Sequence, residues 1–153
     1  MASAPADINV RSYIGQIPFA CLLGFELAVF EGGEAEIRYT AGPDHLNSFD
    51  VTHGGACMTL LDVAMSAAAR SQVPEIGAVT IEMKTSFMRP SVGPLLARAR
   101  LTHRTATLGF VEGTIYDEQQ RACAHATGTY KYVKRRLPIG PASANALRPP
   151  STD

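Results

Sequence analysis

The chain has 153 residues, which is enough for one domain with its own core and too few for two ordinary domains. Its 14 basic and 14 acidic side chains cancel, so no overall field draws it to nucleic acid or to an anionic membrane surface. The N-terminus lacks the regions of a secretion signal, no apolar run is long enough to span a bilayer, and the three cysteines are widely spaced. We therefore expect a cytoplasmic protein with free thiols that binds neither nucleic acid nor membrane.

The first predicted elements are a broken helix and a hairpin. Apolar side chains recur at roughly helical spacing across residues 8–23, but Pro18 must bend or interrupt a helix there. Residues 25–30 and 35–40 are short segments that flank a Gly-bearing turn, residues 31–34, and they have the pattern of paired strands.

A long buried helix is predicted over residues 54–70, after a loop over residues 41–52 that has no hydrophobic period. Alanine, leucine and methionine favour helix here, and apolar side chains cover nearly its whole circumference. Such a helix has to be wrapped by other elements.

Four longer strands follow the helix and supply this wrapping, with turns rich in Gly, Pro or polar residues between them. In the first of these strands a mainly apolar set alternates with polar residues: Val79, Ile81, Met83, Thr85 and Phe87. The alternation predicts that this set shares one face, turned toward a core. The four strands are expected over residues 78–88, 95–104, 107–116 and 122–133.

The chain divides into one domain and two flanking segments. The domain covers residues 25–134, after an N-terminal helical segment over residues 1–24. Residues 135–153 are rich in Pro, Ala and Ser and are expected to form a disordered tail.

One carboxylate stands out in the predicted buried helix. Asp62 is the only charged residue within residues 54–69, and a buried carboxylate is usually paired, neutralised or functional. A narrow polar face is formed by residues spaced by four, three and four: Gly55, Thr59, Asp62 and Ser66. An exposed stripe on an amphipathic helix would have the same pattern, but a polar groove for a ligand accounts better for the single acid.

The helix begins at His53-Gly54-Gly55, where free backbone N–H groups and the helix dipole can bind developing negative charge. Glycine lets a substrate oxygen approach these N–H groups closely. Alone, paired glycines are more often a conformational feature of a loop–helix junction. The combination becomes specific because Asp62 follows eight residues after Gly54.

The spacing of these two features implies a site shared between chains. Eight residues at about 1.5 Å rise place Gly54 about 12 Å from Asp62 along the helix, so both cannot act on one carbonyl within one chain. If the helix N-terminus polarises the carbonyl, the carboxylate should come from another subunit. An antiparallel two-fold pairing would create two equivalent sites.

The motif that combines Asn47, His53-Gly54-Gly55 and Asp62 is the strongest part of a wider pattern. Through this pattern the chain resembles the hotdog thioesterases of the phenylacetate-pathway (PaaI) type, within the group that includes 4-hydroxybenzoyl-CoA thioesterases. The resemblance extends from about Gly24 to Val133. It includes Phe87-Met88-Arg89-Pro90, Gly93 and Gly128-Thr129.

The resemblance implies an α+β hotdog fold, with a long central helix wrapped by a curved antiparallel sheet, and a homodimer at least, with a homotetramer expected. It implies hydrolysis of an acyl- or aryl-CoA thioester without a metal or cofactor, since coenzyme A is part of the substrate. The family's roles place the Gly54 N–H at the thioester carbonyl, Asn47 near the water or carbonyl, and Thr80 beside the water. Asp62 is then general base or nucleophile, and Ser66 is a further pocket candidate.

Two residues near the helix start have simpler interpretations. His53 is better placed to shape the loop by a hydrogen bond than to act as a base. Cys57 has no evident partner base and is interpreted as a small buried apolar side chain. The other histidines are scattered among different elements and do not predict a metal site.

A row of cations is predicted on the second long strand, where Arg98, Arg100, Thr102 and Arg104 alternate with less polar residues and face away from the core. Such a row is usually only a solvated face. Because CoA carries phosphates and the protein has no net charge, these arginines and Arg89 are also candidates for CoA contacts. The remaining substrate-binding candidates are His53, Gly55 and Ser66.

Two other functions stay open. Hotdog hydratases and dehydratases act on acyl thioesters with a His paired to an acid, and His53 and Asp62 are the right residue types. A non-catalytic acyl-CoA sensor is the other alternative, although no helix-turn-helix pattern accompanies the domain. The spacing of Asn47, Gly54 and Asp62 favours hydrolysis, and the acyl group is left open.

Overall fold

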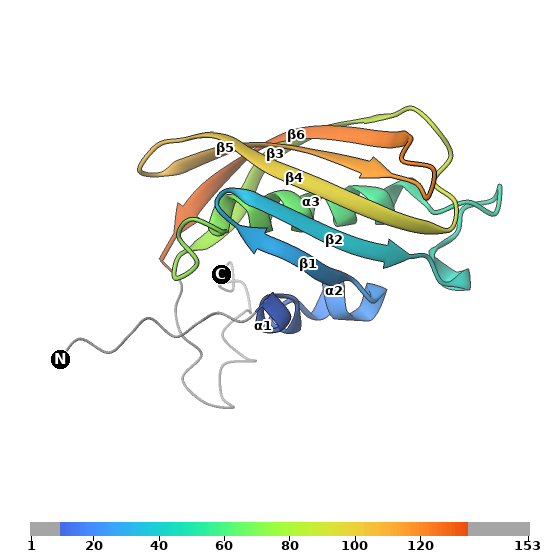
Figure 1. The fold of residues 1–153 in the computed structure, drawn as a ribbon, viewed down its shortest axis with the longest axis horizontal. Coiled ribbons are helices and arrows are strands. Elements are labelled where there is room, and N and C mark those ends of the chain that lie inside the picture. Colours follow the sequence, from blue (N-terminus) through green and yellow to red (C-terminus); the bar gives the residue numbers. More distant parts are fainter. Residues whose placement is uncertain (1–9, 135–153) are drawn as a thin grey trace, which may run out of the picture.

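Six antiparallel strands form one open sheet that curves over a long helix, in the order β1-β2-β4-β5-β6-β3 (Figure 1). The computed structural model describes residues 10–134, so the predicted tail and the first nine residues of the N-terminal segment lie outside the described residues. The α+β hotdog arrangement is confirmed. The elements are α1 (Val10–Gly15), α2 (Pro18–Leu23), β1 (Glu26–Glu31), β2 (Glu34–Thr40), the 3-10 helix η1 (Pro43–His45), α3 (Gly54–Arg70), β3 (Gly77–Phe87), β4 (Pro94–Arg104), β5 (Leu108–Tyr116) and β6 (Ala122–Val133).

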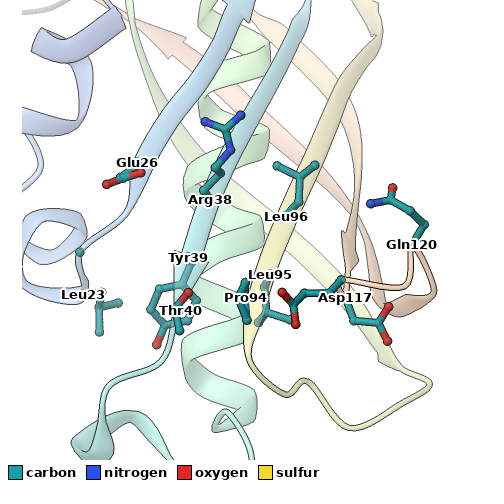
Figure 2. Close-up of a pocket in the computed structure, with 12 residues that line it drawn as sticks. Leu23, Glu26, Arg38, Tyr39, Thr40, Pro94, Leu95, Leu96, Asp117 and Gln120 are labelled. Atoms are coloured by element: carbon teal, nitrogen blue, oxygen red, sulfur yellow. The ribbon is translucent and has the colours of Figure 1, made fainter.

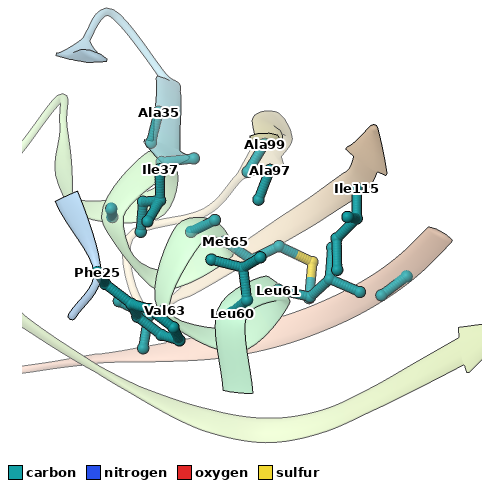
Figure 3. Close-up of a cluster of buried hydrophobic side chains, with 14 of the residues drawn as sticks. Phe25, Ala35, Ile37, Leu60, Leu61, Val63, Met65, Ala97, Ala99 and Ile115 are labelled. Atoms are coloured by element: carbon teal, nitrogen blue, oxygen red, sulfur yellow. The ribbon is translucent and has the colours of Figure 1, made fainter. Parts of the chain in front are cut away.

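The core lies between α3 and the concave face of the sheet. Ten of the 17 residues of α3 are buried, which confirms that other elements wrap this helix. Figure 3 shows Leu60, Leu61 and Met65 of α3 against Ile37 of β2 and Ile115 of β5. Complete burial of one such side chain stabilises the fold by about 1.5–3 kcal/mol.

Small residues on the strands let the sheet approach α3 closely. A Cβ on Gly113 of β5 would lie 3.1 Å from the side chain of Met65 and 3.3 Å from that of Leu61. Ala97 and Ala99 of β4 are buried on the same face. The small volume of these strand residues, as well as their apolar character, therefore fixes the long helix against the middle of the sheet.

The predicted broken helix is present as two short helices. Pro18 is the first residue of α2, where its missing N–H removes no intrahelical hydrogen bond. Gly24 caps the end of α2, and its φ of 76° is in the left-handed region that glycine adopts without strain. Both helices lie near β1 at one edge of the sheet (Figure 1). None of the helices within residues 10–134 is long and apolar enough to cross a bilayer.

A bulge in β3 interrupts the alternation of faces predicted for that strand. Thr80 pairs with Tyr130 of β6 and Glu82 pairs with Thr129, so Ile81 is an extra residue. Cross-strand partners share a face of the sheet. Because of the extra residue, even-numbered residues before Ile81 point to the face that odd-numbered residues after it point to. Thr80 faces α3 with Met83, whereas Val79 and Ile81 do not join the predicted apolar face and are 47% and 56% exposed.

A second bulge, in β4, breaks the predicted cation row. Leu101 pairs with Val111 and His103 pairs with Phe110, which leaves Thr102 as the extra residue. Arg104 is consequently turned to the face opposite that of Arg98 and Arg100, and its guanidinium lies 5.2 Å from the centre of the Tyr132 ring. The three arginines do not form one row.

Candidate active site

Asp62 lies at the middle of α3 and is held by two hydroxyl groups from the sheet. Thr80 Oγ1 donates a hydrogen bond of 2.7 Å to Asp62 Oδ1, and the hydroxyl of Tyr130 donates one of 2.9 Å to the same oxygen. The Tyr130 hydroxyl also lies 3.2 Å from the backbone oxygen of Asp62. Three elements, α3, β3 and β6, thus meet at one carboxylate.

Tyr130 was not among the predicted site residues. It is fully buried, and burial together with the negative charge of Asp62 raises the pKa of its hydroxyl well above the usual range. The hydroxyl therefore stays protonated and acts as a donor near neutral pH. The available signal was weak: a tyrosine on the core face of a strand needs a partner for its hydroxyl, and Asp62 is the only acid on the facing helix.

The N-terminus of α3 is capped by His53. Its Nδ1 accepts a hydrogen bond of 2.8 Å from the Gly55 N–H, which confirms the predicted role of His53 in shaping this junction. Among residues 10–134 no group accepts a hydrogen bond from the Gly54 N–H. One donor at the positive end of the helix dipole is thus available to a ligand.

A pocket of about 590 Å³ opens beside this N-terminus. Asn47, Gly54 and Arg89, all predicted site residues, contribute to its wall. The Asn47 side-chain oxygen accepts hydrogen bonds from the N–H groups of Phe49 (2.9 Å) and Val51 (3.3 Å), so the residue also shapes the loop. The other lining residues are mostly apolar: Phe49, Val51, Thr52, Cys57, Phe87, Met88, Pro90 and Ser91.

Within one protomer the predicted site is in two parts. Asp62 and Thr80 contact each other, but neither lines the pocket at Gly54. The rise along α3 from Gly54 to Asp62 is about 12 Å. Ser66, one turn beyond Asp62, is 3.4 Å from the hydroxyl of Tyr13, and burial raises the pKa of that tyrosine.

The remaining predicted arginines lie away from the pocket. Arg98 is 2.9 Å from a carboxylate oxygen of Glu36, and Arg100 is 2.6 Å from one of Glu112, on the sheet face turned away from α3. Of the four arginines proposed for CoA, only Arg89 lines the pocket at Gly54, and its guanidinium also donates to the backbone oxygen of Ala122.

A second hollow, of about 460 Å³, lies on the outer face of the sheet near the ends of β2 and β4 (Figure 2). Arg38, Glu26 and Asp117 bring charges of both signs to it. It contains none of the predicted site residues, and its mixed lining does not define a particular ligand.

Comparisons with known proteins agree with the fold. The family model of the thioesterase superfamily matches residues 49–124, which include Gly54, Asp62 and Thr80. SSO1253 of Saccharolobus solfataricus, a proposed esterase, is 28% identical over 123 residues, covering 80% of this chain and 82% of the relative.

Two solved structures extend the comparison. PaaI from the phenylacetic acid degradation operon of E. coli superposes with a TM-score of 0.76 at 26% identity, covering 82% of this chain and 91% of that one. The structure of smu.793 from Streptococcus mutans, solved bound to acetyl-CoA, superposes with a TM-score of 0.68 at 25% identity, covering 74% and 92%. The match to the family model over residues 49–124, together with the long helix and wrapping sheet shared with these structures, places the chain in one family: it belongs to the thioesterase superfamily and has the hotdog fold.

Proposed function

We propose that the protein hydrolyses an acyl- or aryl-CoA thioester to the free acid and CoA. The observation that carries the proposal is a carboxylate held by two donors, combined with a helix N-terminus beside a largely apolar pocket. At that N-terminus no group among residues 10–134 accepts a hydrogen bond from the Gly54 N–H. A thioester needs carbonyl polarisation, a placed nucleophile and an acceptable thiolate leaving group, and these two features meet the first two needs.

In the proposed reaction the Gly54 N–H donates to the thioester oxygen as negative charge develops there. The Asp62 carboxylate either takes a proton from an attacking water or attacks the carbonyl carbon itself to form an anhydride that water then opens. The carbon–sulfur bond breaks in both routes, and the electron pair leaves with the CoA sulfur. We favour the general-base route. Asn47 and Thr80 position water or substrate.

The two parts of the site are proposed to come from different chains. The rise of about 12 Å from Gly54 to Asp62 prevents both from reaching one carbonyl within a protomer. Within residues 10–134, β3 is an edge strand whose only partner is β6, and its exposed Val79, Ile81 and Phe87 suit an antiparallel contact with a second copy. A dimer is therefore the smallest active unit in this proposal, and the tetramer expected from the resemblance stays a prediction.

The leaving group is proposed to be CoA because a relative of this fold, smu.793, was solved with acetyl-CoA bound. Arg89 is the favoured contact for a CoA phosphate, since it is exposed and lies at the pocket. The hydratase alternative is less well supported: among residues 10–134 no histidine bonds to Asp62, and His53 is used at the start of the helix.

The test is a panel of acyl-CoA substrates with thiol release measured for each. Aryl-acetyl, hydroxybenzoyl and medium aliphatic acyl groups should be included, and an enoyl-CoA should be followed by its absorbance. Thiol release from at least one substrate, lost in Asp62→Asn, is expected. Water addition to the enoyl-CoA without thiol release would overturn the proposal in favour of a hydratase. Binding of an acyl-CoA without any turnover would overturn it in favour of a sensor.

A further inference from the structure

The two oxygens of the Asp62 carboxylate have different surroundings. Oδ1 receives both hydroxyl donors, from Thr80 at 2.7 Å and from Tyr130 at 2.9 Å. No group among residues 10–134 donates a hydrogen bond to Oδ2. Two donors on one oxygen fix the rotation of the carboxylate and leave the other oxygen available for a reacting group.

We propose that Tyr130 is a positioning residue, whose hydroxyl holds Asp62 through Oδ1 so that Oδ2 is presented to water or to the thioester. This inference rests on the proposed thioesterase function. It adds a residue that does not touch substrate and acts only through Asp62.

The neighbouring charges make Tyr130 suited to this role. Burial and the charge of Asp62 raise the pKa of the Tyr130 hydroxyl, so it remains a donor wherever Asp62 is ionised. On α1, burial raises the pKa of the Tyr13 hydroxyl, and the charge of Asp62 acts in the same direction. The guanidinium of Arg70 on α3 lies over the Tyr13 ring, 5.0 Å from its centre. Glu82 on β3 is bonded to Thr129 on the outer face. On β6, Lys131 pairs with Val79 and is exposed.

β6 also provides a matched control. Tyr132, two residues after Tyr130, is buried as well, and its hydroxyl donates a hydrogen bond of 2.8 Å to the backbone oxygen of Ala69 on α3. Tyr130 and Tyr132 therefore both tie β6 to α3, but only Tyr130 bonds to the Asp62 carboxylate. Removing each hydroxyl separates a positioning role from a structural one.

The first measurement is the pH dependence of kcat/KM for Tyr130→Phe, Tyr132→Phe and the unchanged protein. A donor to a carboxylate stabilises its ionised form, so loss of the Tyr130 hydroxyl should move the acid limb of the profile to higher pH. We expect Tyr130→Phe to shift this limb upward by about one pH unit and to lower kcat about tenfold with little change in KM. Tyr132→Phe should keep the limb of the unchanged protein, whatever its loss of stability.

The second measurement needs no activity. The Asp62 carboxyl carbon, labelled with ¹³C and assigned with Asp62→Asn, is titrated by NMR in the same proteins. In the unchanged protein the ¹³Cζ signal of Tyr130, but not that of Tyr132, should follow the titration of Asp62. A Tyr130→Phe titration identical to that of Tyr132→Phe, or a Tyr130 signal indifferent to Asp62, overturns the inference. If no acyl-CoA is hydrolysed, the proposed function fails, while NMR still decides whether Tyr130 holds Asp62.

Discussion

The carboxylate of Asp62 needs partners that offset the free-energy cost of removing its charge from water. It is the only charged residue of α3 before Arg70 and lies among buried neighbours. Two hydroxyl donors on one oxygen and partial exposure provide that compensation in a protomer. The same arrangement orients the carboxylate, which a base or nucleophile needs.

Asp62→Asn should lower kcat by about 10² or more while the protein remains folded, because the amide keeps the shape but cannot accept a proton or attack. Thiol release gives the rate, and circular dichroism confirms the fold. Asp44→Asn, an exposed change on η1, serves as the control and should retain full activity. Near-normal turnover in folded Asp62→Asn would rule out the proposed mechanism.

Asn47→Ala and Thr80→Ala should each reduce turnover less than Asp62→Asn does, because these side chains position water or substrate and form no bond in the reaction. The comparison is made at saturating substrate, so that kcat alone is ranked. A loss in either variant equal to that of Asp62→Asn would mean that the roles have been assigned incorrectly.

The cysteines should be dispensable for catalysis. Burial raises the pKa of the Cys57 and Cys123 thiols, so little of either is thiolate near neutral pH, whereas Cys21 is exposed. Iodoacetamide at neutral pH should therefore modify Cys21 first and leave thioester hydrolysis intact, as peptide mass mapping and an activity assay would reveal. Rapid modification of Cys57 with loss of activity would instead indicate a nucleophilic thiol.

At the scale of elements, the N-terminus of α3 depends on two glycines with different surroundings. A Cβ on Gly55 would lie 3.0 Å from Nδ1 of His53 and would disturb the cap, whereas a Cβ on Gly54 would make ordinary contact at 3.5 Å with the Phe87 ring. We expect Gly55→Ala to be less stable than Gly54→Ala by about 1 kcal/mol. Urea unfolding of the two variants measures the difference, and equal stabilities would show that the His53 cap contributes little.

The sequence predicted the elements better than it predicted the faces of the strands. The helix over residues 54–70 and the paired segments follow from local periodicity and turn composition, and the structure confirms them. The bulges at Ile81 and Thr102 depend on pairing with a neighbouring strand and have no local signature, so the predicted positions of Val79 and Arg104 were wrong. Tyr130 was missed because its importance comes from a residue 68 positions away.

At the scale of the whole molecule, the shared site predicts complementation between inactive chains. Asp62→Asn is mixed with Gly54→Leu, whose side chain extends into the pocket, and the subunits are allowed to exchange. In a heterodimer one site carries both defects and the other has an intact Gly54 and an intact Asp62 from opposite chains. Equal mixing should restore about one quarter of the normal activity, because half of the dimers are mixed and each has one good site.

The controls for this mixture are each variant exchanged with itself, which should stay inactive. Native mass spectrometry confirms that heterodimers have formed, and gel filtration of the unchanged protein tests whether any monomer is active. Heterodimers without thiol release, or a fully active monomer, would show that each site is complete within one chain.

The extra residue in β3 has an evolutionary consequence. Because Ile81 is an extra residue, its removal would join Thr80 directly to Glu82, and both residues could keep their partners on β6. A change of length at this point can thus leave the Thr80 hydroxyl beside Asp62. In a protein of this fold whose strand lacks the extra residue, the position equivalent to Thr80 has to be assigned from strand pairing, because counting residues back from Met83 would align Thr80 with a side chain on the opposite face.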